Sequence, residues 1–436
     1  MGRMNRLPRP SARLRMAVTP VLMGFAISAC DRGARNGNGA GGDGPYADKV
    51  RESIPQIERA TGLKFKAPPK LEVRTKAQVR EFLVGKFDEQ QPARELASEE
   101  LVYKTLGLIP QSLDLRKFLL DLYTEQIVGF YDPAKKVLYV VEGAPREVAR
   151  ITVAHELIHA LQDQYLNLDS LQRATADGDR TLAAQAVVEG QATYEQMISM
   201  VGGEGNIAAR LPGGWDQVRQ MIREARNEMP VFATAPTLIQ EVLIFPYLSG
   251  AEFVRRFKEQ RPGQSPLEHL PISTEQVLQT AAFFGPRPDL PTRVTLPAPR
   301  SGERVYENNL GEFGIRVFVY EHGKDQNAAL RAAAGWDGDR YVLVRTGGGH
   351  GIAWITVWDS AVDAAEFSGA LAESVLQRYG GTPTGPAGGA RSFTGSGRSV
   401  QITPSERGGK TLVMYVDVPA GASLDVIDLT RVGLSE

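Results

Sequence analysis

The 436-residue sequence predicts an α+β protein with two folded parts. A helical pattern at residues 146–168 follows a short apolar run at 136–141 that is typical of a strand. A second helical segment at 181–194 is rich in Ala and Val, and helical and strand patterns alternate again after residue 307. We expect a first domain at 49–285, a proline-rich linker at 286–306, and a smaller C-terminal α+β domain of unknown role at 307–436.

The N-terminal segment, residues 1–29, predicts a signal peptide. Five arginines precede an apolar run at 16–27 that is too short to span a bilayer, and no acidic residue occurs before Asp31. The sequence Ile27-Ser28-Ala29-Cys30 resembles the lipobox of bacterial lipoproteins. That resemblance implies cleavage before Cys30 and lipid attachment to its sulfur. A plain secretory signal followed by an incidental cysteine is the alternative.

The predicted anchor places the protein in the cell envelope, on the periplasmic or outer face of a membrane. Residues 30–48 are rich in Gly and are expected to form a flexible tether. No later run of eighteen apolar residues predicts a membrane span. The formal net charge of −1 and the interspersed signs argue against nucleic-acid binding. The sequence does not indicate an oligomeric state.

The segment around residue 156 carries the pattern His155-Glu156-Leu157-Ile158-His159. Helical geometry puts the two histidines one turn apart on one face, so both imidazoles can reach one metal ion. Glu156 lies about 100° round the helix, near enough to hold a water molecule on that metal without binding the metal itself. We expect a Zn²⁺ site. The alternative is an ordinary core helix with two paired histidines.

A catalytic zinc site needs a third protein ligand and one open position. Gln162 and Tyr165 stand where the metzincin pattern requires Gly and His, so that pattern is excluded. Glu189 is the candidate, because a mid-helix acid among small and apolar residues is costly without a charged partner. Gly190 and Ala192 would let the two helices approach closely. The alternatives are that Glu189 is on a solvated face, or that Glu195 is the ligand.

These residues together resemble the gluzincin branch of the zinc metallopeptidases, the peptidase MA-like group, over about residues 113–255. The resemblance rests on His155-Glu156-x-x-His159 followed by Val188-Glu189-Gly190-x-Ala192-Thr193. It implies a zincin-like domain, with His155, His159 and Glu189 as zinc ligands, Glu156 as general base on zinc-bound water, and a peptide or protein substrate. Thermolysin-type members carry an Asp where this chain has Thr193. Asp163 or another group would then orient a histidine.

Two further features extend the resemblance. The strand at 136–141 follows a turn signal at 129–133, and Lys135 and Lys136 favour an exposed edge that binds an extended peptide, although a fully paired interior strand is equally compatible. The segment Tyr247-Leu-Ser-Gly-Ala251 resembles the Tyr-x-x-Gly-Ala motif of aminopeptidase-like gluzincins. It implies that the Tyr247 hydroxyl stabilises the oxyanion. A buried structural tyrosine is the alternative.

The remaining patterns carry no assigned chemistry. We expect a turn at 335–339, which is either a structured turn or a ligand loop built on Trp336, Asp337 and Asp339. The three other histidines, His269, His322 and His350, are expected at the surface. Further helices are predicted at 114–124, 215–226, 310–320, 326–334 and 361–378, and strands at 340–345, 352–358, 399–403 and 410–418.

The sequence therefore predicts zinc-dependent peptide-bond hydrolysis by a membrane-tethered extracytoplasmic protein. One alternative is a binding or assembly lipoprotein in which the zinc site is structural, with four protein ligands. The other is a zinc hydrolase that acts on non-peptide amides.

Overall fold

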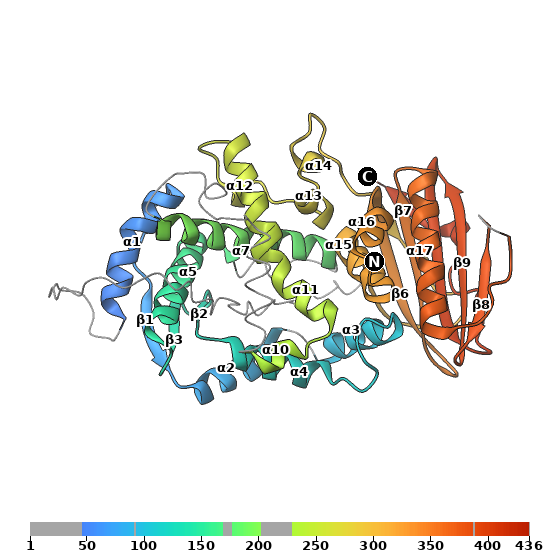
Figure 1. Ribbon diagram of the computed structural model, residues 1–436, viewed down its shortest axis with the longest axis horizontal. Helices are drawn as coiled ribbons and strands as arrows, with labels where there is room; N and C mark the ends of the chain where they lie inside the picture. Colours follow the sequence, from blue (N-terminus) through green and yellow to red (C-terminus); the bar gives the residue numbers. More distant parts are fainter. Residues whose placement is uncertain (1–45, 91–92, 169–176, 202–228, 387–388, 436) are drawn as a thin grey trace, which may run out of the picture.

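The computed structural model describes residues 46–90, 93–168, 177–201, 229–386 and 389–435. Figure 1 shows a first part, coloured blue to yellow, beside a C-terminal part in orange and red. The predicted signal peptide, Cys30, most of the tether and the helix expected at 215–226 lie outside the described residues. Among the helices that are described, none has both the length and the apolar character needed to cross a bilayer.

The elements of the first part follow in chain order, and they include the helices predicted at 114–124 and 146–168. They are α1 (Ala47–Thr61), β1 (Lys70–Arg74), α2 (Lys76–Gln90), α3 (Ala93–Thr105), α4 (Leu115–Gln126), β2 (Gly129–Asp132), β3 (Val137–Val141), α5 (Arg146–Tyr165), α7 (Gly178–Val201), α10 (Pro230–Ala233), α11 (Thr237–Phe245), the π-helix η2 (Pro246–Gly250), α12 (Ala251–Gln260), the short η3 (Pro266–Glu268), α13 (Thr274–Leu278) and α14 (Thr280–Phe284).

A three-stranded sheet with the order β1-β3-β2 supports the helix that carries the HExxH pattern. β3 pairs in parallel with β1 and antiparallel with β2. Successive side chains of β3 alternate between the faces of the sheet. Leu138 and Val140 share a buried cluster with Val153 and Leu157 of α5. The opposite face, which includes Tyr139, packs against residues of α2 and α4.

Two expectations about this sheet are wrong. The stretch 129–133 is a turn only from Pro133, because Gly129–Asp132 forms β2; the chain reverses over 133–136, where Lys136 adopts a positive φ of 58°. The strand at 136–141 is not an exposed edge either, because β3 is paired on both sides. The edge strand beside α5 is β2, which pairs only with β3 in this sheet.

The C-terminal part, which the sequence predicts to be α+β, is an antiparallel sheet with helices on one face. Its sheet order is β5-β6-β7-β10-β9-β8. Its elements are β4 (Arg293–Thr295), β5 (Glu303–Asn308), α15 (Gly311–Gly323), α16 (Gln326–Ala333), β6 (Trp336–Thr346), β7 (Gly349–Trp358), α17 (Ala361–Tyr379), β8 (Arg391–Gly395), β9 (Arg398–Arg407), β10 (Lys410–Pro419), the short η4 (Leu429–Arg431) and β11 (Gly433–Ser435).

Two boundaries in this part differ from the sequence prediction. The segment 286–306 is not simply a linker, because it contains β4, which pairs with β11, and the start of β5. The expected turn at 335–339 is mostly strand, since β6 begins at Trp336. Asp339 accepts hydrogen bonds from the indole nitrogens of Trp336 and Trp354, at 3.1 and 2.8 Å. This part of the expected ligand loop therefore has a structural role.

The two faces of the C-terminal sheet are both covered. Along β6, Tyr341 and Leu343 belong to the cluster formed with α15, α16 and α17. Their neighbours Val342 and Val344 belong to a second cluster that includes Val294 of β4 and other residues near the C-terminal end. The central strands are consequently buried on both sides, which explains their nearly continuous apolar sequences.

The junction between the two parts is specific. The first cluster also contains Leu106 of the segment after α3, as well as residues of α7 and α12, so the hydrophobic core is continuous across the junction. His322 of α15 is half-buried there, and its Nε2 lies 3.0 Å from the carbonyl oxygen of Leu106. The expectation that His322 is a surface residue is therefore wrong, whereas His269 is exposed.

Candidate metal centre

The three expected metal ligands come together at one point. His155 and His159 lie one turn apart on α5, and Glu189 lies on α7. The Nε2 atoms of the two imidazoles are 3.1 Å apart. Glu189 Oε2 lies 3.3 Å from His155 Nε2 and 3.4 Å from His159 Nε2. The structure thus groups these three side chains as a candidate metal site, with none more than 6% exposed.

The spacing of these atoms fits a zinc ion. Zn–N and Zn–O bonds measure about 2.0–2.1 Å, and neighbouring ligands of a regular tetrahedron are then about 3.3–3.4 Å apart. The three observed separations, from 3.1 to 3.4 Å, are close to that value. Two imidazoles and one carboxylate also form a ligand set typical of catalytic zinc. The side chains therefore fit this metal with little rearrangement.

The charges within the centre are strongly coupled. Burial alone would lower the pKa of His159, but the neighbouring Glu189 carboxylate raises it to about 9. Burial alone would raise the pKa of Glu189, but the His159 and His155 imidazoles lower it below its usual range. The buried carboxylate thus needs a positive partner at this position. A metal cation would replace the proton that otherwise supplies this charge.

Gln162, one turn after His159, orients the second histidine. Its side-chain nitrogen donates to the Val188 carbonyl at 2.9 Å and to Gln191 Oε1 at 3.0 Å. Those bonds direct Gln162 Oε1 toward His159 Nδ1, which lies 2.8 Å away. In the neutral form that can bind a metal, His159 therefore carries its proton on Nδ1, and the lone pair on Nε2 faces the other ligands. Sequence reasoning used Gln162 only to exclude the metzincins, although its i+3 spacing from His159 was a usable signal.

The first histidine has no such partner among the described residues. His155 Nδ1 is buried without a hydrogen bond. Thr193 stands where thermolysin-type enzymes carry an Asp, and its hydroxyl oxygen is also buried without a partner. The replacement of that Asp by Thr193 thus leaves His155 Nδ1 without a hydrogen-bond acceptor among the described residues.

Asp163 does not orient a histidine, contrary to one expectation. It accepts hydrogen bonds from the Tyr131 hydroxyl at 2.8 Å and from Lys136 Nζ at 2.6 Å. Tyr131 belongs to β2, and Lys136 to the turn that follows it. Asp163 therefore fastens α5 to the β2–β3 hairpin and fixes the edge strand beside the centre.

Glu156, the expected general base, is 3% exposed and touches the same edge strand. One carboxylate oxygen, Oε2, accepts the backbone N–H of Tyr131 at 2.7 Å, and the other, Oε1, is buried without a partner among the described residues. The pKa of Glu156 is raised, because burial outweighs the attraction of His159 and His155. One oxygen is thus held in place while the other is available as a proton acceptor. The role of β2 in this arrangement was not predicted.

The position of Glu189 depends on a close crossing of helices. A Cβ atom on Gly190 would lie 2.2 Å from the backbone carbon of Gly250, and one on Gly250 would lie 1.9 Å from the carbonyl oxygen of Ala186. The backbones of α7 and η2 are therefore in direct contact. Gly190 serves this crossing rather than the approach to α5 that the sequence predicts. Ala192 does belong to the cluster that contains the apolar face of α5.

Glu195, the alternative ligand, is not part of the centre. It is fully buried and forms an ion pair with Lys258 of α12. This ion pair links α7 to α12, in addition to the hydrophobic cluster that the two helices share.

Tyr247 lies next to the centre on the π-helix η2. Its ring centroid is 6.0 Å from that of His155, and the residue is 5% exposed. Because Gly250 sits three residues later in η2, the contact with α7 also sets the position of this tyrosine. The structure thus brings together all five residues predicted for the site.

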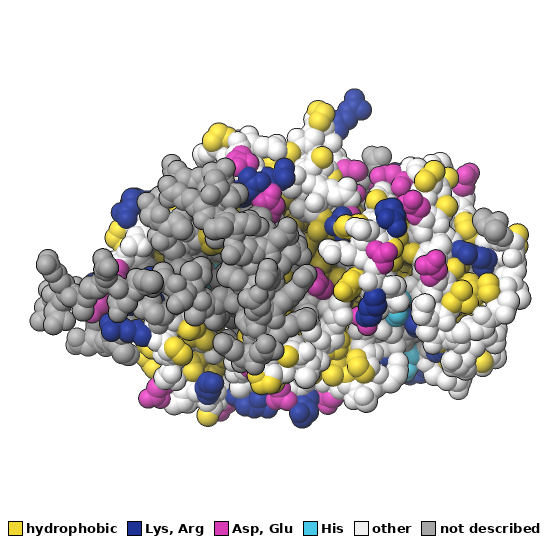
Figure 2. All heavy atoms as spheres, in the orientation of Figure 1, with side chains coloured by type: hydrophobic (Ala, Val, Ile, Leu, Met, Phe, Trp, Pro, Cys, Tyr) yellow, Lys and Arg dark blue, Asp and Glu magenta, His cyan; other side chains and the backbone are white. Residues whose placement is uncertain are grey.

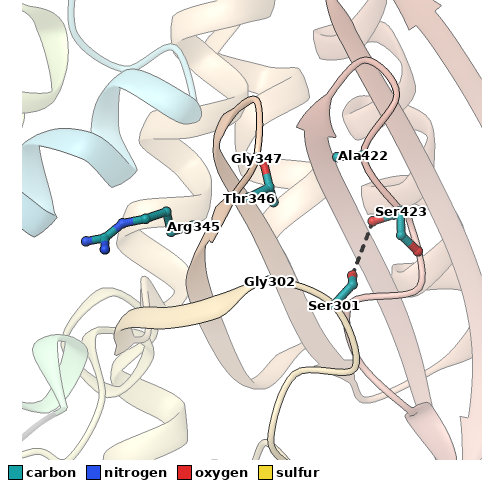
Figure 3. Close-up of a pocket in the computed structure, with 7 residues that line it drawn as sticks. All are labelled: Ser301, Gly302, Arg345, Thr346, Gly347, Ala422 and Ser423. Carbon is teal, nitrogen blue, oxygen red and sulfur yellow. Dashed lines mark hydrogen bonds between the residues drawn. The ribbon is translucent and has the colours of Figure 1, made fainter.

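Other hollows on the protein have different linings. One, on the C-terminal part, is bordered by Ser301, Arg345 and Ser423, and Figure 3 shows Ser301 bonded to the carbonyl of Ser423, at 3.4 Å. Arg345 itself lies 3.4 Å from Glu303. Basic and acidic side chains are interspersed over the described residues on the face shown in Figure 2.

Comparison with known proteins adds little to this geometry. A family model described as "Domain of unknown function (DUF8575)" matches residues 297–428, within the C-terminal part. A crystal structure from Chloroflexus aurantiacus, described as "a putative hydrolase with a novel fold", is 20% identical with a TM-score of 0.34, over 55% of this chain and 87% of that one. None of the curated proteins matches the chain. An identity of 20% and a TM-score of 0.34 do not indicate a function for this chain.

Proposed function

We propose that the protein is a zinc-dependent hydrolase that cleaves peptide bonds, with His155, His159 and Glu189 as the metal ligands. The observation that carries the proposal is the triangle of buried ligand atoms, 3.1 to 3.4 Å apart, beside a carboxylate with one unpartnered oxygen. Zinc bound there would act as a Lewis acid and lower the pKa of a water molecule to about 7.

Glu156 is the general base in this proposal. Its Oε2 is restrained by the Tyr131 N–H, so Oε1 has a fixed direction and no competing donor. Oε1 takes a proton from the attacking water and returns it to the leaving amine. Burial raises the pKa of Glu156, which makes this carboxylate a stronger proton acceptor.

The edge strand β2 supports a peptide as the substrate. Tyr131 directs its N–H away from β3 and toward Glu156, so the edge of β2 that pairs with no other described strand faces the general base. An extended peptide that pairs with this edge would present its backbone to Glu156. Tyr247, beside His155, is proposed to donate a hydrogen bond to the oxyanion that forms on the attacked carbonyl.

The proposed location is the cell envelope, through a lipid on Cys30 and the tether at 30–48. The lipobox-like sequence before Cys30 supports this part of the proposal. A Cys30→Ser variant should leave the membrane fraction when cells are lysed without detergent, while its zinc content stays unchanged. Equal membrane association of the variant would contradict lipid attachment at this residue.

The catalytic proposal is tested with Glu156→Gln, which keeps the size of the side chain. We expect about one zinc per chain in both proteins, but a loss of peptide hydrolysis of about 10²–10⁴-fold in the variant. Glu142→Gln, at an exposed position directly after the end of β3, is the matched control and should keep full activity. Zinc is measured by mass spectrometry and cleavage with a peptide library, each with and without a chelator.

Three outcomes would contradict the proposal in different ways. Unchanged cleavage in Glu156→Gln would remove Glu156 from the mechanism. Chelator-sensitive cleavage of other amides but of no peptide would correct the substrate class. A cobalt-substituted protein whose spectrum shows four protein ligands, with no exchangeable solvent, would make the site structural.

A further inference from the structure

A second group of acids lies at the junction of the two parts, away from the histidines. Glu275 belongs to α13, Asp289 to the segment between α14 and β4, and Asp359 follows the last residue of β7. One carboxylate oxygen from each lies within 4.8 Å of the other two. Three segments that are distant in sequence thus bring three formal negative charges to one place.

These carboxylates have no donors. None of the three forms a side-chain hydrogen bond or ion pair with another described residue, yet Glu275 is only 4% exposed. The nearby Lys410 does not fill the gap, since its Nζ is bound to Asp337 Oδ2 at 2.8 Å. Because an unpaired buried carboxylate is costly, Glu275 indicates that a cation belongs at this position.

The surroundings of Glu275 reinforce this conclusion. Burial, followed by the charges of Glu312, Asp289 and Asp359, raises the pKa of Glu275 to about 9. One oxygen of Glu312 is itself buried without a hydrogen-bond partner. Without a cation, this part of the protein has to hold a proton at neutral pH. Asp289 and Asp359 are exposed, which leaves the group accessible from solvent.

We propose that Glu275, Asp289 and Asp359 bind a divalent cation of the calcium type. Hard cations prefer carboxylate oxygens, and Ca²⁺ binds them at about 2.3–2.6 Å, so one ion can bridge oxygens up to about 5 Å apart. Ca²⁺ also tolerates an irregular set of ligands completed by water, whereas Mg²⁺ requires a compact octahedron. An open cluster of three carboxylates therefore favours Ca²⁺.

Such an ion would fasten the junction near the helix that carries Glu189. Thr274, which directly precedes Glu275, donates its backbone N–H to Asp179 in the first turn of α7. Binding at the cluster would hold α13 against the turn after β7 and so support this contact. The site does not depend on the proposed peptidase activity.

The test uses the full chain, freed of divalent ions other than zinc, and follows its melting temperature as CaCl₂ is added up to 10 mM. With a dissociation constant in the range of about 10⁻⁴–10⁻³ M, we expect a rise of at least about 3 °C. Glu275→Gln should abolish the rise, and its melting temperature without calcium should equal or exceed that of the wild type, because the neutral amide needs neither a proton nor a cation.

Two controls separate the site from its surroundings. Glu366→Gln removes an exposed carboxylate of α17 outside the cluster and should keep the full rise. Glu189→Gln removes a carboxylate from the zinc site and should also keep it. The proposal is overturned if the wild type shows no rise, if Glu275→Gln keeps the rise, or if the rise disappears in Glu189→Gln instead.

Discussion

The crossing of α7 and η2 can be tested by adding a single methyl group at Gly190. In a Gly190→Ala variant, the new Cβ would lie 2.2 Å from the backbone carbon of Gly250 and 2.4 Å from its carbonyl oxygen. Ordinary contacts begin near 3.4 Å, so the two backbones must separate by about 1 Å. Both contact atoms belong to the main chain, and no side-chain rotation can relieve the overlap.

The expected cost has two parts. Overpacking of a tight contact costs about 1–3 kcal/mol, and Ala in place of Gly within a helix returns about 1 kcal/mol. Because the three atoms nearest to the new methyl group are all backbone, we expect a net loss and a lower melting temperature, by about 2–4 °C for each kcal/mol. Glu189 precedes Gly190 directly, so the same displacement should weaken zinc binding at least about tenfold.

Circular dichroism measures the melting temperature, and competition with a chromophoric chelator measures zinc affinity. Gly369→Ala is the matched control, because Gly369 also lies within a helix but has open space around its Cβ position. That variant should be as stable as the wild type or slightly more stable. If Gly190→Ala behaves like Gly369→Ala in both assays, the close crossing does not determine the position of the ligand.

Three further predictions concern groups around the centre and the junction. Gln162→Ala should lower zinc affinity about 10–100-fold with little change in fold, as the chelator competition would show, because His159 loses the acceptor that fixes its tautomer. Burial and the nearby Arg378 lower the pKa of His322 to about 4, so the stability it contributes is complete above about pH 6.5 and is lost as the pH falls toward 4. Urea denaturation should detect a loss of about 2 kcal/mol in the free energy of unfolding at pH 5, and a smaller loss in His322→Gln. An equal loss in the two proteins would show that His322 is not the group responsible. Asn309→Ala should destabilise the protein by about 1 kcal/mol in the same denaturation assay, because Asn309 Oδ1 accepts the Asp179 N–H at the start of α7.

The candidate metal site could be predicted because its signals are local. The spacing of His155 and His159 follows from helical geometry, and the sequence around Glu189 shows a polar group that would be costly to bury alone. Both signals act within one helix each, so no tertiary information was needed to propose them. The structure confirms that the three side chains form one group.

The strand order was harder to predict for a physical reason. β2 and β3 are both short, and an apolar run does not reveal which of two neighbouring strands is paired on both sides. The lysines before β3 indicated that β3 is the edge strand. Lys136 instead lies in the turn before β3 and pairs with Asp163. The close contact at Gly190 was assigned to α5 for a similar reason. A small residue indicates that another segment packs closely against it, but it does not identify that segment.

The C-terminal part contributes to the centre through α7, although it supplies no ligand. The backbone N–H groups of Gly178 and Asp179, at the start of α7, donate to the side chains of Asn308 and Asn309 at 2.9 and 3.1 Å. Gly311, with a φ of +70°, leaves just enough room for the Asp179 carboxylate, which a Cβ at that position would overlap. Glu189 follows Asp179 by ten residues, or about 15 Å of continuous helix. A helix is stiff over that distance, so a displacement of the first turn of α7 would move Glu189 by a similar amount. The candidate metal site therefore depends on both parts of the chain, because residues of the C-terminal part seat the first turn of the helix that carries Glu189.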